Sequence, residues 1–284
     1  MKLSKIFALL LALCLISSAA CAATFTDAHG NVIELDDSLE AYAAVTLVGA
    51  DNAARQGETN LGDLWADALR WFAVSGEINA AFDEDDVKAG NDRIAVDADH
   101  VVALWNGGNL RADIAEGTFG AEALAEVLPF PNNVAVVYMT GAQLLETLEA
   151  ASQGLPYTAE TADACASLMQ VSGLTYTVDT TKAYDALEAY GDHWFTAGSV
   201  SRVRIDDVNG QPFDAEATYA VVTSNANFNG MDSSYVLKAA AEANEQSAVT
   251  TAVVRDVVFR FIAAELNHQV GEAYAAPQGR LTIL

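Results

Sequence analysis

The chain is poor in cysteine: it has three in 284 residues. Cys14 and Cys21 fall in an N-terminal leader, so Cys165 is the one cysteine expected within the folded part. A lone cysteine cannot form an intramolecular disulfide, and a disulfide-stapled scaffold is therefore excluded.

Residues typical of catalytic and metal sites are also scarce. The four histidines are scattered, and we find no zinc-spaced Cys or His cluster, no Gly-Lys-Ser or Gly-Lys-Thr phosphate loop and no Gly-x-Ser-x-Gly elbow. We therefore predict no catalytic residue, no metal ligand and no cofactor in this chain.

Basic residues are outnumbered by acidic ones, 14 to 39, for a formal net charge of −25. Removal of a leader containing Lys2 and Lys5 leaves 12 basic residues against the same 39 acids, a net charge of −27. Such a surface repels nucleic acid and anionic membranes. We predict no nucleic-acid partner, and an anionic ligand could bind only where arginines converge.

Long apolar runs are missing beyond the N-terminus. Residues 1–22 have the layout of a secretory signal peptide, in which two lysines precede an apolar stretch and then small residues. The stretch is too short to span a bilayer, and no other segment approaches the ~20 apolar residues of a transmembrane helix. The mature protein is expected outside the cytoplasm, as a secreted, periplasmic or cell-surface protein.

Two processing routes fit the end of this leader. Ala20-Cys21-Ala22 matches an A-x-A cleavage site, whereas Ser18-Ala19-Ala20-Cys21 loosely resembles a lipobox. We favour plain cleavage, and a lipid anchor on Cys21 is the alternative.

About 260 residues remain, which suits one large domain or two small ones. Residues 24–35 read as a hairpin around His29-Gly30-Asn31, so 23–44 is assigned as an N-terminal extension and 45–284 as the main domain.

Periodicity predicts alternating helices and strands in the main domain. Asn60, Thr118 and Thr140 are the predicted N-caps of three helices, the last with Gln143 completing a capping box. The predicted helices are 60–74, 118–128, 140–150 and 251–266, the strands are 101–105, 133–139, 169–178, 200–208, 219–223 and 280–284, and 190–197 is a loop. This order favours an α+β fold, a mixed β-sheet with packed helices.

The segment Asn106-Gly107-Gly108-Asn109-Leu110-Arg111 directly follows an apolar run and reads as an anion cradle. Gly107 and Gly108 permit a tight turn and close approach to a ligand, Asn109 tolerates positive φ, and Arg111 carries a fork of donors. Taken alone, the segment fits an ordinary strand-ending turn equally well.

Six blocks in order strongly resemble the C-terminal domain of the 5′-nucleotidase family, over roughly residues 45–284. Each block is weak alone, but their shared order makes coincidence improbable. The blocks are Arg55-Gln56-Gly57-Glu58-Thr59-Asn60-Leu61-Gly62-Asp63-Leu64, residues 106–111, Val127-Leu128-Pro129-Phe130, residues 168–174, residues 209–213 and Gly279-Arg280-Leu281-Thr282-Ile283.

The resemblance implies a domain that binds the nucleoside part of a substrate. Arg55, Asn106 and Arg111 would hold its polar groups, Phe130 would be one of two rings that sandwich the base, and Asp232 would contact the ribose hydroxyls. These chemistries agree with the residue types, because Arg forks suit anions, aromatic faces suit bases and a carboxylate accepts hydroxyl protons.

The chain departs from the family pattern at three positions. Ala226 stands where the second ring is expected, Ser233 replaces a Gly after the acid, and Asn109 replaces a third Gly. Phe228 could replace the missing ring if the loop shifts. Without a replacement, the loss of ~1–3 kcal/mol of stacking weakens base binding roughly tenfold to hundredfold.

In this family a separate N-terminal metallophosphoesterase domain holds two metal ions and cleaves the phosphate ester. Asp27-Ala28-His29-Gly30 superficially resembles its first motif, but its later motifs have no counterpart, and the roughly thirty residues before Arg55 are too few for such a domain. We therefore predict a free-standing nucleotide- or nucleoside-binding domain, associated with nucleotide catabolism and without catalytic activity of its own.

Two alternatives stay open. The chain could be the subunit of a split 5′-nucleotidase that works with a separate metallophosphoesterase chain, in which case the divalent metal belongs to that partner. It could also be a structural relic that binds nothing.

Overall fold

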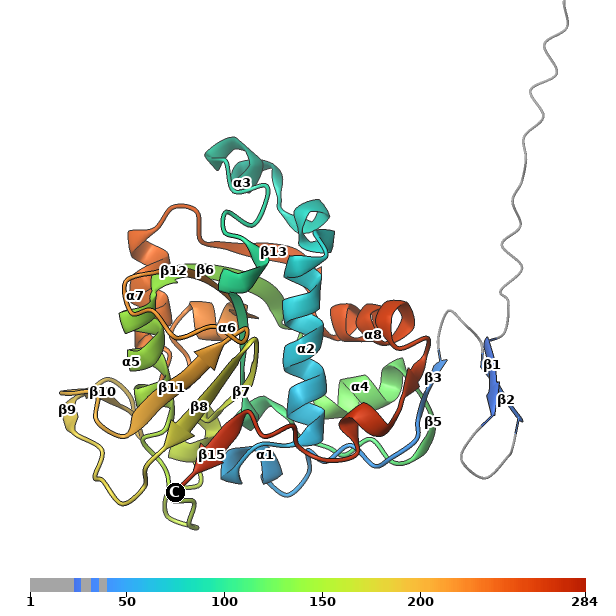
Figure 1. Ribbon diagram of the computed structural model, residues 1–284, viewed down its shortest axis with the longest axis horizontal. Coiled ribbons are helices and arrows are strands. Elements are labelled where there is room, and N and C mark those ends of the chain that lie inside the picture. Colours follow the sequence, from blue (N-terminus) through green and yellow to red (C-terminus); the bar gives the residue numbers. More distant parts are fainter. Residues whose placement is uncertain (1–22, 27–31, 36–39) are drawn as a thin grey trace, which may run out of the picture.

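A central five-stranded sheet organises the computed structural model, which describes residues 23–26, 32–35 and 40–284 (Figure 1). Its strand order is β13-β6-β12-β4-β7, in which β12 and β4 are parallel and the other neighbours antiparallel. The strands are β4 (Val101–Asn106), β6 (Asn133–Thr140), β7 (Met169–Ser172), β12 (Thr218–Ser224) and β13 (Ala248–Val253).

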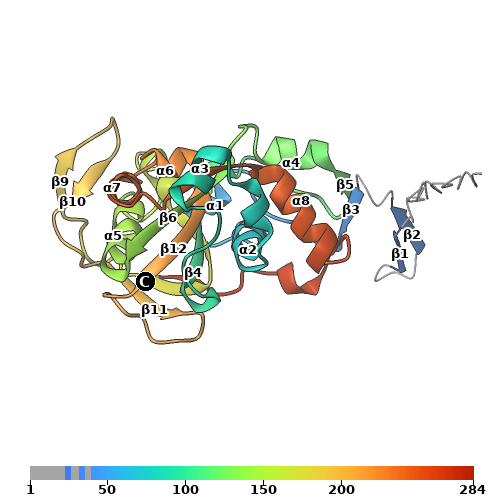
Figure 2. The same ribbon diagram turned by 90° about the horizontal axis from the view of Figure 1, so that it is seen from above.

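Both faces of this sheet are buried, because successive side chains of a strand point to opposite faces. In β4, Val101, Ala103 and Trp105 pack into one core, while Val102 and Leu104 pack into the other. Figure 2 shows the helices of the first core on one side of the sheet and those of the second core on the other. The first core contains α2 (Asn60–Val74), α4 (Ala121–Val127) and α8 (Val254–Glu265), and the second α5 (Gly141–Ala151) and α7 (Tyr235–Ala243).

Smaller sheets and short helices complete the fold. One three-stranded sheet has the order β11-β8-β15, another β14-β3-β5, and two hairpins pair β1 with β2 and β9 with β10. Their strands are β1 (Ala23–Thr26), β2 (Val32–Leu35), β3 (Glu40–Ala43), β5 (Gly117–Gly120), β8 (Leu174–Val178), β9 (Ala186–Ala189), β10 (Phe195–Ala197), β11 (Val203–Val208), β14 (Gln269–Val270) and β15 (Leu281–Ile283), and the short helices are α1 (Ala53–Gln56), α3 (Glu84–Ala89) and α6 (Asn225–Phe228).

The fold class expected from the sequence is confirmed, and so are two of its elements in detail. Helix α2 spans the predicted residues 60–74, and the side chain of Thr140 caps α5 with Gln143 completing the capping box. The predicted cap of α2 is wrong by one residue: Thr59, not Asn60, accepts the backbone N–H of Gly62, at 3.0 Å.

Four other predictions are corrected by tertiary pairing. Thr118 lies in strand β5, so α4 begins only at Ala121. Residues 248–253 pair with β6 as strand β13, so the helix predicted over residues 251–266 begins only at Val254. The predicted loop 190–197 includes strand β10 of the β9–β10 hairpin.

The fourth correction concerns the predicted single strand 169–178. Gly173 has φ 81° and divides it into β7 of the central sheet and β8 of the β11-β8-β15 sheet. A Cβ atom at Gly173 would lie 2.6 Å from Nε of Arg70, so the chain can change sheets here only with glycine.

The N-terminal boundary also differs from the sequence assignment. Strand β3 lies before residue 45, yet it pairs with β5 and β14 of the main domain. The expected hairpin of residues 24–35 is present as β1 and β2, whereas Asp27 and His29 lie outside the described residues. No helix among the described residues is long and apolar enough to cross a membrane.

Candidate ligand-binding site

Strand β4 leads directly into the predicted cradle. Residues Gly107–Asn109 form a short 3-10 turn, and the side chain of Asn106 is fully buried at the end of the strand. A Cβ at Gly108 would lie 2.6 Å from Cβ of Ala166, and one at Gly107 would overlap the carbonyl of Ala54. The two glycines therefore let the turn fit tightly between α1 and the 3-10 turn Ala164–Ser167.

A chain of amide hydrogen bonds connects this turn to Asp232. Nδ2 of Asn109 donates to Oδ1 of Asn106 at 2.8 Å, and Nδ2 of Asn106 donates to Oδ2 of Asp232 at 2.7 Å. The sequence predicts only a tolerance of positive φ for Asn109, but Asn109 lies in the 3-10 turn and acts through its side chain. It orients Asn106, which in turn positions the carboxylate.

The loop that carries Asp232 is held in an unfavourable backbone conformation. Gly230, Asp232 and Ser233 have φ angles of 89°, 50° and 65°. Left-handed backbone costs a non-glycine residue about 1–2 kcal/mol. Ser233 offsets part of this cost, because its Oγ donates to the Ala150 carbonyl at 2.9 Å and accepts from Nε2 of Gln153 at 2.6 Å.

Two arginines lie within electrostatic reach of Asp232. Burial raises the pKa of this carboxyl, and the charges of Arg55 and Arg111, followed by the Asn106 hydrogen bond, oppose that rise. The structure thus brings the four polar residues selected from the sequence to one place.

The two arginines differ in how much they are already engaged. Arg55, on α1, is 9% exposed, donates to the Ala162 carbonyl at 2.8 Å and lies 3.8 Å from Asp163. Arg111 is exposed, and no acid among the described residues lies within ion-pair distance of it. Its guanidinium is the freer of the two for an anionic ligand.

Phe130 lies next to Arg111. The guanidinium carbon of Arg111 is 5.8 Å from the centre of the Phe130 ring, and the Arg111 amide donates to the Val127 carbonyl at 2.9 Å. The ring is 46% exposed. A cation over an exposed ring contributes about 0.5–1 kcal/mol, so this pair is weakly held and leaves apolar ring surface open.

The region of the missing ring is partly filled by core packing. Phe228 is half-buried and packs against the core that contains α5 and α7. Its stacking role stays a prediction. Ala226 is half-buried, and its carbonyl accepts the amide of Met231 at 3.1 Å.

Sequence reasoning missed the β9–β10 hairpin as a neighbour of the site. The amide of Phe195 donates to Oε1 of Gln153 at 3.0 Å, and Nε2 of His193 lies 3.7 Å from Asp163. Tyr190 is hydrogen-bonded to Ser233, and burial raises the pKa of its hydroxyl to about 12. The aromatic run from Tyr190 to Phe195 was the one available signal.

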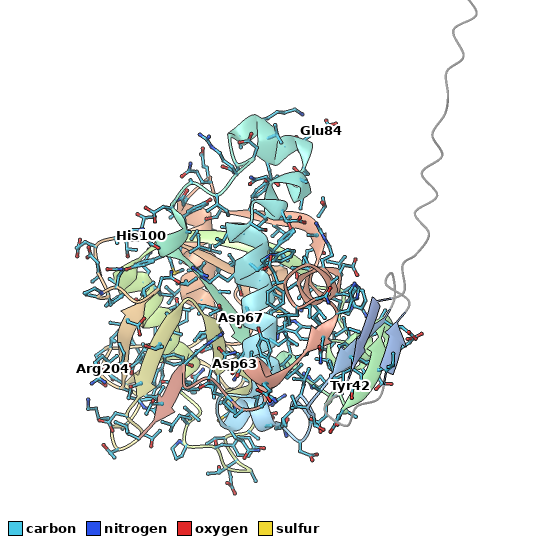
Figure 3. All side chains as sticks on the ribbon, turned by 45° about the vertical axis from the view of Figure 1, so that its right-hand side comes forward. Tyr42, Asp63, Asp67, Glu84, His100 and Arg204 are labelled. Carbon is cyan, nitrogen blue, oxygen red and sulfur yellow. The ribbon has the colours of Figure 1, made fainter. Side chains whose placement is uncertain are left out.

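A second group of charged residues lies elsewhere and joins Asp63 and Asp67 of α2 (Figure 3) to Arg280, which precedes β15. Nη2 of Arg280 is 2.8 Å from Oδ2 of Asp67, and its Nε is 3.9 Å from the fully buried Asp63. Burial, and then the charge of Glu58, raise the pKa of Asp63 to about 8, which Arg280 opposes. The hydrogen-bonded Asp67 is therefore the principal ionic partner of Arg280.

Metal binding has no candidate centre in the described part of the chain. Within residues 23–26, 32–35 and 40–284, no three His, Cys, Asp or Glu side chains are grouped as metal ligands.

Comparison with known proteins gives consistent matches. The family model of the 5′-nucleotidase C-terminal domain matches residues 40–239. The trifunctional nucleotide phosphoesterase protein YfkN of Bacillus subtilis is 28% identical over 188 residues, which cover 65% of this chain and 10% of that protein.

Solved structures agree with the sequence matches. The 5′-nucleotidase precursor from Thermus thermophilus has a TM-score of 0.61 and 29% identity, covering 86% of this chain and 39% of that one. The NAD nucleotidase of Haemophilus influenzae, at a TM-score of 0.56 and 16% identity, covers 86% of this chain and 38% of that one and supports the fold alone. The chain thus spans well under half the length of these relatives.

Proposed function

We propose, since this chain belongs to the 5′-nucleotidase C-terminal domain family, that it binds a nucleoside or nucleotide outside the cytoplasm. In this proposal it serves nucleotide catabolism as the ligand-holding domain and does not cleave the phosphate ester by itself.

The observation that carries the proposal is the convergence of Arg55, Arg111, Asn106 and Asp232 beside an exposed ring. The Asp232 carboxylate keeps a lone pair for ribose hydroxyls, because Asn106 occupies only one side of Oδ2. Arg111 offers its guanidinium to an anionic group, and Phe130 offers its open face to a base. A single nucleotide has all three of these groups: ribose hydroxyls, an anionic group and a base.

The convergence of two arginines is significant because the molecule as a whole is strongly acidic. With 39 acidic and 14 basic residues, the surface repels anions in general. Two arginines act on Asp232 there, and because Arg55 also lies 3.8 Å from Asp163, Arg111 is the guanidinium that suits a ligand with a phosphate group.

Calorimetry with adenosine and AMP tests the proposal. The wild-type protein binds both, and Phe130→Ala weakens adenosine binding about tenfold to hundredfold, from ~1–3 kcal/mol of stacking. Val87→Ala, which removes another exposed apolar side chain on α3, is the matched control and leaves binding unchanged. Absence of binding to either ligand would favour the structural-relic alternative.

A second candidate is the substrate-binding subunit of a split 5′-nucleotidase. Its support is that the relatives are named as nucleotidase and phosphoesterase, and that this chain matches 39% and 10% of their lengths. Purified protein mixed with AMP and divalent metal ions tests it: hydrolysis only after a separate metallophosphoesterase is added supports the split enzyme. Metal-dependent hydrolysis by this chain alone would refute the non-catalytic proposal.

A further inference from the structure

The β9–β10 hairpin projects from the edge of the molecule beside α5, as both Figure 1 and Figure 2 show. All four residues of β9 are exposed, so burial of its side chains contributes little to holding this strand in place. Hydrogen bonds of β10 connect the hairpin to the domain. The amide of Phe195 donates to Oε1 of Gln153, and the amide of Ala197 donates to the Tyr235 hydroxyl, each at 3.0 Å.

Gln153 joins this hairpin to the loop that carries Asp232. It lies in the turn that follows α5, and both ends of its side-chain amide are used. A backbone amide can only donate, so Oε1 faces the hairpin, and Nε2 is left to donate to Oγ of Ser233, at 2.6 Å. The Ser233 hydroxyl also donates to the Ala150 carbonyl at 2.9 Å and is hydrogen-bonded to Tyr190 of the hairpin. Two side chains therefore connect the hairpin to Ser233.

The backbone of Ser233 requires this support. Its φ angle is 65°, and that of Asp232 before it is 50°. Glycine adopts such angles readily, whereas any other residue is destabilised there. The hydrogen bonds of the Ser233 hydroxyl stabilise this conformation, in which the neighbouring Asp232 carboxylate accepts from Nδ2 of Asn106 at 2.7 Å. The position of Asp232 thus depends on contacts that reach the hairpin.

We propose that Gln153 and Ser233 are positioning residues that couple the β9–β10 hairpin to Asp232, so that the docked hairpin sets how tightly the site binds the ribose hydroxyls of its ligand. This inference rests on the proposed nucleoside-binding function. Coupling between two places in a protein is reciprocal. A hairpin that stabilises Asp232 for the ligand is therefore itself stabilised when the ligand binds.

Calorimetry with adenosine and with 2′,3′-dideoxyadenosine, which lacks the ribose hydroxyls, tests the positioning. Gln153→Ala weakens adenosine binding about 5- to 30-fold, the factor that corresponds to one unsupported left-handed residue, and leaves dideoxyadenosine binding unchanged. Ser233→Ala has the same effect, because alanine keeps the unfavourable backbone and loses the hydroxyl. Ser233→Gly binds adenosine as tightly as wild type, since glycine needs no support, and adding Gln153→Ala to it causes no further loss.

Hydrogen exchange at the Phe195 amide, followed by NMR, tests the coupling. In wild type, adenosine slows this exchange, because a ligand held by Asp232 also stabilises Ser233 and, through Gln153, the acceptor of the Phe195 amide. Ser233→Gly binds adenosine but has no hydroxyl to connect the loop with the hairpin. In that variant adenosine leaves the exchange of the Phe195 amide unchanged.

Controls separate this coupling from a loss of folding and from the general function. Gln211→Ala, at an exposed glutamine in the turn after β11, changes neither affinity, and thermal melting confirms that every variant is folded. The inference is overturned if folded Gln153→Ala binds adenosine as tightly as wild type, if both nucleosides lose affinity equally, or if adenosine slows Phe195 exchange as much in Ser233→Gly as in wild type. Failure of wild type to bind adenosine overturns the proposed function together with this inference.

Discussion

Two regions of the molecule combine arginine with aspartate, and they differ in what their donors already bind. Around Arg280, Nη1 donates to the Val171 carbonyl at 2.7 Å and Nη2 contacts Asp67 and Gln278 at 2.8 and 2.7 Å. Arg111 has no such acid within ion-pair distance among the described residues and rests against an exposed ring.

This difference indicates that the arginine–aspartate group around Arg280 stabilises the fold, whereas the group around Arg111 is available to a ligand. The Arg280 network joins the C-terminal segment to helix α2, since Arg280 and its acidic partners are mostly buried and Nη2 is hydrogen-bonded to Asp67. The Arg111 and Asp232 groups are close enough to influence one another without forming an ion pair. The exposure of the side chains and the hydrogen bonds that their donors already make, more than residue type, distinguish a structural cluster from a binding site.

Breaking the Arg280 network should have the largest effect. Arg280→Ala leaves Asp67 partly buried without its ionic partner, and such losses cost about 3–5 kcal/mol of unfolding free energy. Urea unfolding followed by circular dichroism measures it. Arg204→Ala, at a side chain that is 72% exposed, is the matched control and changes stability by less than about 1 kcal/mol. A loss below that value for Arg280→Ala would make the network dispensable.

Asp232→Asn tests the region around Arg111 and Asp232, and it should weaken ligand binding without lowering stability. The substitution replaces a charged acceptor, and hydrogen bonds to charged groups contribute about 1.5–3 kcal/mol, so adenosine affinity falls by that amount. The melting temperature stays the same or rises, because burial disfavours the charged carboxylate.

Asp92→Asn makes the same charge change at an exposed position and is the control for this experiment. Intact adenosine binding combined with a large loss of stability would show that Asp232 serves the loop and not the ligand.

The sequence predicted what depends on local pattern. Helix α2 was found because its apolar residues recur on one face, and the Thr140 cap because its partner Gln143 lies three residues away. The change of sheet at Gly173 was missed because the apolar alternation continues through it, and only a contact with Arg70 reveals the break.

The site shows the same limit. Asn106, Arg111, Phe130 and Asp232 were selected by motif, yet the motif does not reveal that Asn109 orients Asn106 or that Asp232 has a left-handed backbone. The β9–β10 hairpin was missed because β9 is exposed throughout and carries no buried alternation. Its proximity to the site depends on long-range contacts such as the one between Phe195 and Gln153.

The pH dependence of stability tests the network around Arg280 and has the smallest expected effect. Burial, and then Glu58, raise the pKa of Asp63 from 3.8 to about 8. Below pH 4 this carboxyl is protonated in both the folded and the unfolded chain. Between pH 4 and 8 only the unfolded chain loses the proton, so the contribution of Asp63 to stability decreases as pH rises, by at most about 1.4 kcal/mol per pH unit.

Asp63→Asn carries no proton to lose and should flatten the curve of unfolding free energy between pH 5 and 8, relative to wild type in the same urea titrations. Asp232→Asn should flatten that curve less, because two arginines and the Asn106 hydrogen bond oppose the rise of its pKa. Equal slopes for wild type and Asp63→Asn would mean that Asp63 is ionised in the folded protein, and Arg280 would then have two acidic partners in place of one.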